Sequence, residues 1–413
     1  MKILWIATKI PWPPVDGGRL LLWNTLRALA AAGCDLTLVA PTLGGGAAAA
    51  EAAEELSPFC RLEPVPAALR PTWVDALDAQ LRQRPWTLVR HTLPAMRRRV
   101  AEILAAERFD VIQAEQVQAL GSLATLPAGG PPVVWRAQNV ESDLWHATAD
   151  RLLWRRPLFR LEARRLALWE GAAVRRAAAT VALTDEDRER LAALSAAPDK
   201  LHRVAAPFEA ELPAAGTALP GAPAVVLFGS GGWLPNRRGT RWFIDEVWPL
   251  VRDELAGAEL HCFGERPPGG AVTCHPPPES SRQAFAPGSV LAVPLEIASG
   301  VRMKILEAWA RGVPVVATTA AARGLEAEPG RELLVAESAA DFAAALRQLG
   351  ERPALRRALV DAGRDLLRRE HAFDLVARRL GRLYASLAAA PATAGSPASG
   401  APAAGAPASG GSS

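Results

Sequence analysis

The sequence contains little of what marks several specialised classes of protein. Only four cysteines occur in 413 residues, and Cys34, Cys60, Cys262 and Cys274 show neither CxxC spacing nor a nearby histidine pattern. This argues against a zinc site and predicts reduced thiols with a structural role. The 47 basic and 43 acidic side chains leave a net charge of only +4, which is too small for a general nucleic-acid-binding protein.

Long apolar runs are scarce as well. No stretch reaches the roughly 20 apolar residues of a membrane-spanning helix. The apolar start at Met1–Thr8 is too short for a signal peptide and has no cleavage region, so we expect a cytoplasmic protein. Hydrophobic residues nevertheless make up 50% of the chain, which allows a large core, and the length favours two domains over one.

The beginning of the chain predicts a strand–helix–strand unit. Ile3–Thr8 has the pattern of a buried strand, Arg19–Ala32 that of a helix closed by Gly33, and Leu36–Ala40 that of a second strand. Further strands are expected at 111–113, 133–136 and 180–183. The first half therefore predicts a doubly wound parallel sheet.

The second half repeats this organisation. Residues 207–223 are rich in Pro, Ala and Gly, after which strands are expected at 225–229, 259–263, 290–293 and 313–318, alternating with helices. We predict an α/β protein with two Rossmann-like domains facing across a cleft, at 1–215 and 216–374. Residues 391–413 are almost only Ala, Pro, Gly and Ser, and we expect this tail to be disordered.

The strongest site signal is the loop that follows the expected strand at 290–293. It runs from Pro294 and opens a helix that ends at Gly312. Backbone N–H groups at Gly300 and Val301, the positive end of the helix, and the side chains of Arg302 and Lys304 together could stabilise a diphosphate.

One helical turn further on, Glu307 shares a face with Lys304. The carboxylate could accept hydrogen bonds from ribose hydroxyls while the lysine meets phosphate. A plain surface ion pair between Lys304 and Glu307 is the alternative.

Two glycine-rich turns are further candidates for phosphate binding. Gly17 and Gly18 follow the first strand and open the first helix, although a tight turn would explain them equally well. The turn at 229–232, which includes Gly231, precedes a helix expected near Asn236 with Arg237 close by. It is not a dinucleotide fingerprint, since Leu234 stands where GxGxxG needs glycine, and the arginine could be solvated surface.

These stretches resemble family-four glycosyltransferases of the GT-B fold. The loop and helix, with the following Trp309–Thr318, look like the donor site of a subgroup reading roughly Gly-Ser-Gly-Thr-Arg-Leu-Lys-Ile-Leu-Glu, and Phe228–Asn236 resembles the opening of the same donor domain. The departures from the subgroup are Ala298, Val301 and Met303. The resemblance implies retaining transfer from a nucleotide-diphosphate sugar without a metal or other cofactor, and a helix at 375–390 that crosses back to the first domain.

Two family positions are substituted. Ser299 stands where many relatives carry a first glutamate that contacts the donor sugar, so only the ribose-contacting glutamate carries over, as Glu307. The segment around Gln138, Asn139 and Glu141 is similar to a His-Asn-Val-Glu-Ser segment of the acceptor domain, with Gln138 in place of the histidine. Gln138 could position the donor sugar but not exchange a proton, and Asn139 and Glu141 could instead cap the next helix.

The resemblance also implies a mechanism and an acceptor class. A phosphate oxygen would take the acceptor proton, so that catalysis rests on charge stabilisation by Gly18, Arg302, Lys304 and helix N-termini. We expect a glycan, lipid-linked or small-molecule acceptor, in cell-envelope or exopolysaccharide biosynthesis. Arginines interleaved with apolar residues at 151–165, and a second arginine cluster at 82–99, could rest on an anionic membrane; solvated helix faces would explain them too.

Two rival functions remain open at this point. A sugar-nucleotide epimerase also uses paired α/β domains around a nucleotide diphosphate but needs no separate acceptor. A catalytically silent binding or scaffold protein would account for the substitutions at Ser299 and Gln138. The retained Arg302, Lys304 and Glu307 argue against complete silence.

Overall fold

The computed structural model describes residues 1–42, 46–68, 72–123, 129–151, 156–229, 234–264, 272–276, 278, 281–297 and 299–389. Gly231 and the C-terminal tail at 391–413 lie outside the described residues, as do Leu152–Arg155 of the first basic segment.

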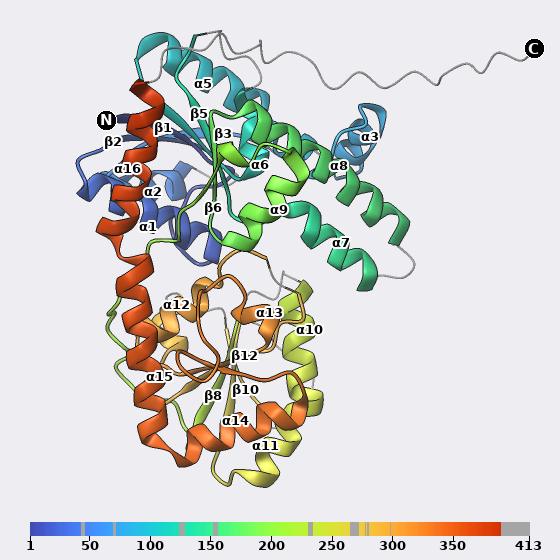
Figure 1. The fold of residues 1–413 in the computed structure, drawn as a ribbon, viewed down its shortest axis with the longest axis vertical. Helices are drawn as coiled ribbons and strands as arrows, with labels where there is room; N and C mark the ends of the chain where they lie inside the picture. The colour runs from blue at the N-terminus through green and yellow to red at the C-terminus, as the bar shows by residue number, and fades with distance from the viewer. Residues whose placement is uncertain are drawn as a thin grey trace, which may run out of the picture.

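A seven-stranded parallel sheet forms the first half of the molecule (Figure 1). Its strand order is β3-β2-β1-β4-β5-β6-β7, so the winding direction reverses between β1 and β4. The carboxyl ends of these two strands flank the crevice where doubly wound sheets bind ligands. The strands are β1 (Lys2–Ile6), β2 (Asp35–Thr42), β3 (Arg61–Pro66), β4 (Val111–Glu115), β5 (Val133–Ala137), β6 (Ala179–Ala182) and β7 (Leu201–Arg203).

A six-stranded parallel sheet forms the second half, with the order β10-β9-β8-β11-β12-β13 and a reversal between β8 and β11. Its strands are β8 (Ala224–Phe228), β9 (Glu259–Phe263), β10 (Thr273–His275), β11 (Val290–Val293), β12 (Val315–Ala317) and β13 (Leu334–Val335). The predicted fold of two doubly wound parallel-sheet units is therefore confirmed.

Helices cover both faces of each sheet. In the first half, α1 and α16 pack on one face of β1 and α5 packs on the other. The helices here are α1 (Gly17–Ala31), α2 (Gly46–Leu56), α3 (Thr72–Leu81), α4 (Trp86–His91), α5 (Pro94–Ala106), α6 (Gln116–Ala119), α7 (Glu141–Arg151), α8 (Arg156–Arg176) and α9 (Asp185–Ser195). Because both faces are covered, most residues of the central strands are apolar and buried.

The second sheet has α12 on one face of β8 and β11, and α11 and α14 on the other. Its helices are α10 (Leu234–Trp242), α11 (Trp248–Glu254), α12 (Met303–Ala310), α13 (Thr319–Ala322), α14 (Ala339–Glu351) and α15 (Pro353–Leu366). A π-helical turn at Phe243–Val247 interrupts the α-helical geometry between α10 and α11. Pro249, in the first turn of α11, has no N–H for the regular helical bond, which accounts for the break.

The last helix, α16 (Phe373–Ala389), returns to the first sheet and packs against α1. Figure 1 shows α15 and α16 running past both halves in succession. The fully buried Tyr384 donates a hydrogen bond to Gln113 Oε1 in β4 at 2.7 Å. Among the described residues, no helix is both long and apolar enough to cross a membrane.

Candidate functional site

The loops at the carboxyl ends of the two sheets face each other across the molecule. Those after β1, β4 and β5 come from the first half, and those after β8 and β11 come from the second. Gly17, at the start of α1, lies against α12, since a Cβ added to it would come within 3.5 Å of the Met303 Cγ. The Gly17–Gly18 turn and the donor loop therefore converge.

Gly18 lies where the backbone must pass close to another side chain. A Cβ at this position would stand 2.8 Å from Gln138 Oε1. The preceding Asp16 caps α1 by accepting from Arg19 N at 2.9 Å and pairs with Lys9 Nζ at 2.8 Å. Burial acts to raise the pKa of Asp16, but Lys9 and the Arg19 N–H outweigh it and hold that pKa below its usual range.

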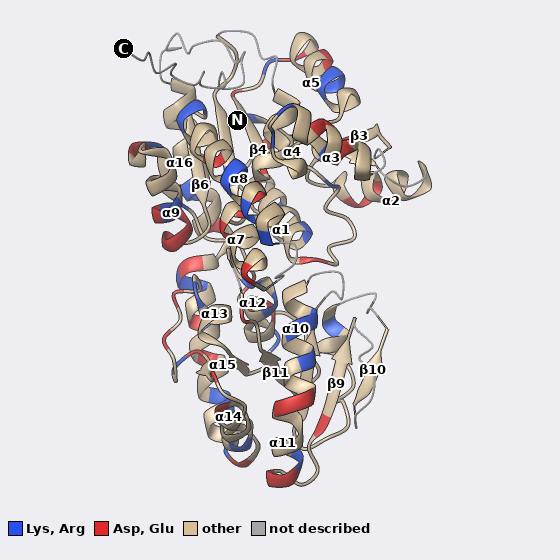
Figure 2. Cartoon of the chain, turned by 90° about the vertical axis from the view of Figure 1, so that its right-hand side faces the viewer, with Lys and Arg blue, Asp and Glu red and all other residues tan. Residues whose placement is uncertain are grey.

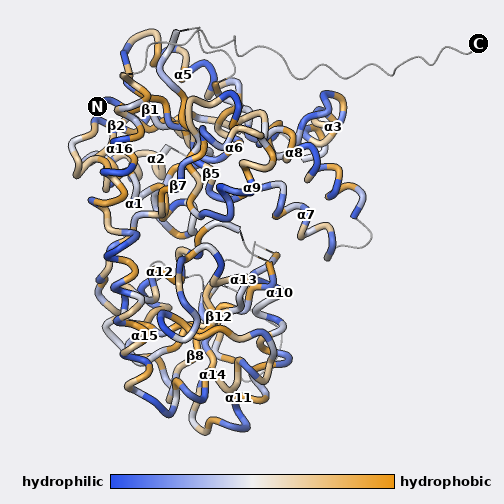
Figure 3. Tube along the Cα trace, in the orientation of Figure 1, coloured by the Kyte–Doolittle hydropathy of each residue, from blue (hydrophilic) through white to orange (hydrophobic). Residues whose placement is uncertain are grey.

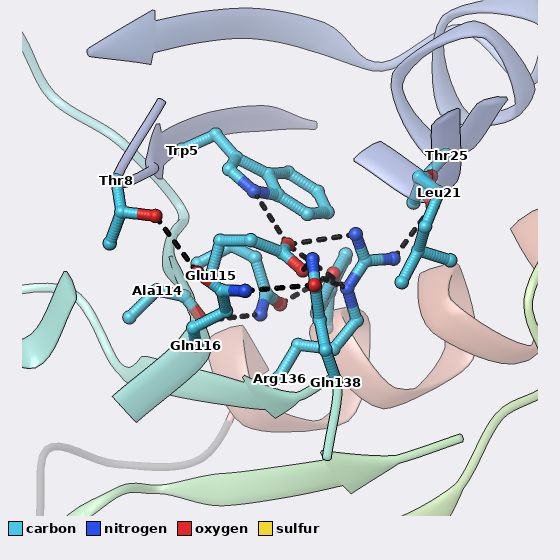
Figure 4. Close-up of polar contacts among 11 residues, drawn as sticks. Trp5, Thr8, Leu21, Thr25, Ala114, Glu115, Gln116, Arg136 and Gln138 are labelled. Carbon is cyan, nitrogen blue, oxygen red and sulfur yellow. Dashed lines mark hydrogen bonds and ion pairs between the residues drawn. The ribbon is translucent and has the colours of Figure 1, made fainter. Parts of the chain in front are cut away.

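Gln138 is held by hydrogen bonds at both ends of its amide (Figure 4). Its Nε2 donates to Glu115 Oε1 at 2.7 Å, and its Oε1 accepts from Gln116 Nε2 at 2.9 Å. Thr8 donates to Gln116 Oε1 at 2.8 Å. This chain fixes which edge of the Gln138 amide faces the cleft.

Glu115 is the centre of this network. The carboxylate is buried and pairs with Arg136 Nη2 at 2.8 Å while also accepting from Trp5 Nε1 at 3.1 Å. Arg136 donates in turn to Thr25 Oγ1 at 2.6 Å. Sequence reasoning missed Glu115 and Gln116; the usable signal was two polar residues at the carboxyl end of a central strand, at the reversal of strand order.

Ser299 and Gly300 contact the first half directly. Ser299 Oγ accepts from Val140 N at 3.1 Å and donates to Asp187 Oδ1 at 3.2 Å. Gly300 has a φ of +71°, and a Cβ there would overlap the carbonyl oxygen of Gln138. The hydroxyl that replaces the family's first glutamate thus joins the two halves of the molecule.

Asn139 reinforces the same contact. With its amide oriented to satisfy both groups, Nδ2 donates to Ser299 O at 2.8 Å and to Gln138 O at 3.0 Å. The structure therefore brings Asn139, Ser299 and Gly300 together at one point of the interface. A capping role for Asn139 at the following helix is not seen.

Arg302 braces the donor loop from within. Its buried guanidinium donates from Nη2 to the carbonyl oxygens of Ser299 and Gly300. Burial lowers the pKa of Arg302 to about 10, and the nearby Asp187 acts in the opposite direction. The side chain is thus turned toward its own loop, and Val301 packs against the core cluster beneath.

Lys304 lies at the carboxyl end of β8. Its Nζ donates to Phe228 O at 2.5 Å and to Asn236 Oδ1 at 3.2 Å. Burial, followed by the charge of Arg302, lowers the pKa of Lys304 to about 8. Arg237 is exposed on α10, on the same helix as Asn236, and its place in the site stays a prediction.

Glu307 has partners other than Lys304. Its Oε1 accepts from Ser281 Oγ at 2.5 Å and from Arg311 Nε at 2.9 Å, so the Lys304–Glu307 ion pair considered from the sequence does not form. Beside Ser281 opens a cavity of about 570 Å³. Its lining includes Phe263 and His275, whose rings stack at 4.1 Å, together with Arg282, Gln283, Thr217 and Leu219.

Glu141 is the first residue of α7, where a helix start near Ser142 was expected. The cap of this helix comes from α8, since Glu170 accepts from Glu141 N at 2.7 Å and from Ser142 Oγ at 2.6 Å. Burial raises the pKa of Glu170 to about 8. The carboxylate of Glu141 contacts the side chain of Gln118, and burial raises the pKa of Glu141 as well.

Two family models match the chain on either side of the predicted boundary. Residues 17–207 match the model described as a glycosyl transferase 4-like domain, and residues 222–352 match glycosyl transferases group 1. No curated protein matches the sequence significantly. The two matched segments together include the Gly17–Gly18 turn, Glu115, Gln138 and the whole donor loop.

Solved structures show the same fold at low sequence identity. Sucrose-phosphate synthase from Thermosynechococcus elongatus superposes with a TM-score of 0.68 at 15% identity, over 94% of this chain and 99% of that one. Anabaena HepE in complex with UDP-glucose gives 0.63 at 14%, over 94% and 100%. The lipopolysaccharide outer core galactosyltransferase WaaB gives 0.54 at 12%, over 94% and 100%.

With both halves matched and the fold shared, the chain belongs to the group 1 (family-four) glycosyltransferases, retaining enzymes that use nucleotide sugars.

Proposed function

We propose that the protein transfers a sugar from a nucleoside diphosphate to a glycan, lipid-linked or small-molecule acceptor, with retention, in cell-envelope or exopolysaccharide biosynthesis. The observation that carries this is Lys304. Its partly desolvated ammonium group lies at the carboxyl end of β8, 3.2 Å from Asn236 Oδ1 and near the start of α12. An incoming diphosphate would supply the counter-charge that this group lacks.

The remaining residues would each bind a different part of the donor. The N-terminal turn of α12 and the Gly17–Gly18 turn would approach the diphosphate from opposite sides of the cleft. Glu307 would exchange its contact with Ser281 for a ribose hydroxyl, and the cavity beside Ser281 would take the base. Arg302 acts by shaping the donor loop, because both loop carbonyls that it binds precede α12.

Gln138 would orient the donor sugar without exchanging a proton. Its Nε2 gives one hydrogen to Glu115, and the second remains for a sugar oxygen. The acceptor proton would pass to a phosphate oxygen of the departing nucleotide on the same face of the sugar. The chain then has to supply placement and charge stabilisation, which these residues provide.

Related structures support a uridine donor as the first to test. HepE was solved with UDP and with UDP-glucose. The decisive experiment incubates the protein with UDP-, GDP-, ADP- and dTDP-sugars, with and without bacterial lipid extract, and follows nucleotide release by mass spectrometry. Release that an acceptor stimulates supports a transferase, and loss of that release in Lys304→Ala but not in Arg241→Ala, an exposed change on α10, assigns it to this site.

The same assay separates the two rivals. An epimerase would convert the sugar of the donor without releasing nucleotide and without an acceptor. A silent binding protein would bind a nucleoside diphosphate but release nothing from any donor. Either result with folded protein would contradict the proposed transfer.

We also propose peripheral contact with an anionic membrane, through α3 and α8. Trp73, Leu77 and Leu81, at four-residue spacing on α3, are 71%, 54% and 76% exposed. Arg165 Nη2 in α8 donates to Gln80 Oε1 at 3.0 Å, which places the two helices side by side. Leu158, Leu161 and Leu168 are exposed on α8, basic residues line that helix in Figure 2, and hydrophobic stretches mark α3 in Figure 3.

The basic clusters expected from the sequence contribute less to this surface than anticipated. Arg90 pairs with Asp75, Arg97 donates to Gly121 O, and Arg99 pairs with Glu63. Sedimentation with phosphatidylglycerol vesicles tests the proposal, with phosphatidylcholine vesicles as the uncharged comparison. Joint replacement of Trp73, Leu77 and Leu81 by Ser should abolish binding, while Leu250→Ser on α11 should not; equal binding of both variants would contradict it.

A further inference from the structure

A second cavity lies in the first half of the molecule, where β1 and β2 end. Its volume is about 40 Å³, room for little more than one water-sized group, given that a water occupies about 30 Å³ in the liquid. It is enclosed by residues from both strand ends and from α4, α5 and α6. The lining residues are Ala7, Thr8, Pro41, His91, Leu93, Met96, Ala119 and Ser122.

His91 is the one titratable side chain among these lining residues. Its Nδ1 lies 2.8 Å from Thr87 O one turn earlier in α4, so Nδ1 carries the hydrogen and Nε2 holds a lone pair. No hydrogen-bond partner of Nε2 occurs among the described residues. Burial lowers the pKa of His91 below its usual range, although the hydrogen bond to Thr87 O and the charge of Asp75 oppose the shift, so the ring is neutral near pH 7.

The cavity is joined to the donor-sugar position by two hydrogen bonds. Thr8, which lines it, donates to Gln116, and Gln116 donates to Gln138. Gln138 in turn lies against the Gly18 turn. A group seated in the cavity is therefore linked through Thr8 and Gln116 to Gln138, the residue proposed to orient the donor sugar.

The lining also restricts the chemistry of an occupant. Five of the eight lining residues are apolar, and the polar ones are a neutral imidazole and two hydroxyls. A phosphate or ammonium group would lose its hydration here without a counter-charge. An uncharged hydroxyl can donate to the imidazole and accept from a hydroxyl, and it fits the available volume.

We propose that this cavity receives a hydroxyl or hydroxymethyl group of a neutral polyhydroxylated acceptor, with His91 Nε2 accepting its hydrogen bond. The inference rests on the proposed transferase function and names the acceptor class of the same site. His91 positions the acceptor, and the proton of the reacting hydroxyl still goes to the phosphate oxygen. His91 does not take over the role of the histidine that family members carry at the position of Gln138. That position faces the donor sugar, whereas His91 recognises the acceptor.

The test uses the full chain, the donor found in the release assay, and methyl α-glucoside and glycerol as probe acceptors beside the lipid extract. His91→Ala should raise the KM of the acceptor about tenfold, the value expected for one lost hydrogen bond of about 1.4 kcal/mol. The KM of the donor and the slow hydrolysis of donor without acceptor should stay unchanged. His91→Gln, which retains an acceptor atom, should recover part of the loss, and His146→Gln on the exposed face of α7 is the control.

A deoxy series of the best acceptor gives the second readout. Removal of the hydroxyl that His91 binds should raise the acceptor KM of the wild type but leave the acceptor KM of His91→Ala unchanged. If transfer occurs and His91→Ala has a wild-type acceptor KM, the inference is overturned while the transferase function stands. If the wild type transfers to no acceptor, the proposed function fails and the inference fails with it.

Discussion

Gln138 and Glu115 are joined by a hydrogen bond of 2.7 Å from the amide nitrogen to the carboxylate. Glu115 is also the partner of Arg136, and both side chains of that ion pair are almost fully buried. The residue that would orient the donor sugar is therefore anchored to a charge pair in the core. Stability and substrate placement share one network here.

Removing Glu115 should destabilise the protein strongly. Glu115→Ala leaves the guanidinium of Arg136 buried without its counter-charge, which costs about 3–5 kcal/mol of unfolding free energy. Urea denaturation measures this, and Asp150→Ala, whose ion pairs are exposed, is the control that should leave stability nearly unchanged. Equal, small effects of the two replacements would contradict the role of the network.

The affinity for nucleoside diphosphate should fall as the pH rises through about 8. The pKa of Lys304 is lowered to about 8, so the free protein loses this positive charge above that pH. Titration calorimetry with UDP at several pH values should show the decline in wild type and not in Lys304→Met.

The lowered pKa of Lys304 also affects stability. Between about pH 8 and the usual lysine pKa of 10.5, Lys304 is protonated in the unfolded chain but not in the folded protein, so the free energy of unfolding should rise with pH in that window.

Glu307→Ala should weaken binding of UDP by roughly tenfold because a hydrogen bond from ribose to a charged acceptor is lost. Comparison of UDP with 2′-deoxy-UDP separates this effect from the disturbance of Arg311 and Ser281. The wild type should discriminate between the two nucleotides, and Glu307→Ala should discriminate less. Undiminished discrimination would place the ribose elsewhere.

Gly300→Ala should separate the two halves of the molecule. The residue has a φ of +71°, and an added Cβ would overlap the Gln138 carbonyl oxygen. Gly257→Ala is a matched control, because its φ is +86° but no atom lies within 4 Å of its added Cβ. Small-angle scattering should detect expansion, and turnover should fall, only in Gly300→Ala.

Glu170 should make stability decrease with rising pH. Its pKa is raised to about 8 against an ordinary value of 4.5, so the folded protein holds the extra proton between these values and stability falls across that window. Glu170→Gln keeps one acceptor for the start of α7 and should flatten the dependence. Chemical denaturation at pH 5 and pH 8 checks this, and an unchanged slope in Glu170→Gln would assign the dependence to other groups.

Local sequence patterns did not predict the side-chain contacts of Ser299, Arg302 and Glu115. Arg302 was expected to stabilise the diphosphate, and Ser299 was read as the substitute for a donor-contacting glutamate. Their contacts in the structure are with Val140, Asp187 and the loop carbonyls. Glu115 carries no motif at all. Its importance arises because β4 and β5 are adjacent, which brings together residues 21 positions apart.

The strands missed by sequence reasoning are β3, β7, β10 and β13, and these are the edges of the two sheets. An edge strand is covered less completely than a central one, so its apolar pattern is weaker, and β3 also contains Pro64. The other strands carry stronger apolar patterns and were recognised.

The sequence by itself determined the two parallel sheets, the glycine-rich turns and the loop that opens α12, because hydrophobic periodicity and backbone freedom are local properties of the chain. Only the tertiary structure decided which polar side chains face a ligand and which face each other. That choice depends on burial and on partners from distant segments: Lys304 faces Asn236 and the end of β8, Ser299 joins the two halves, and Glu115 holds Gln138.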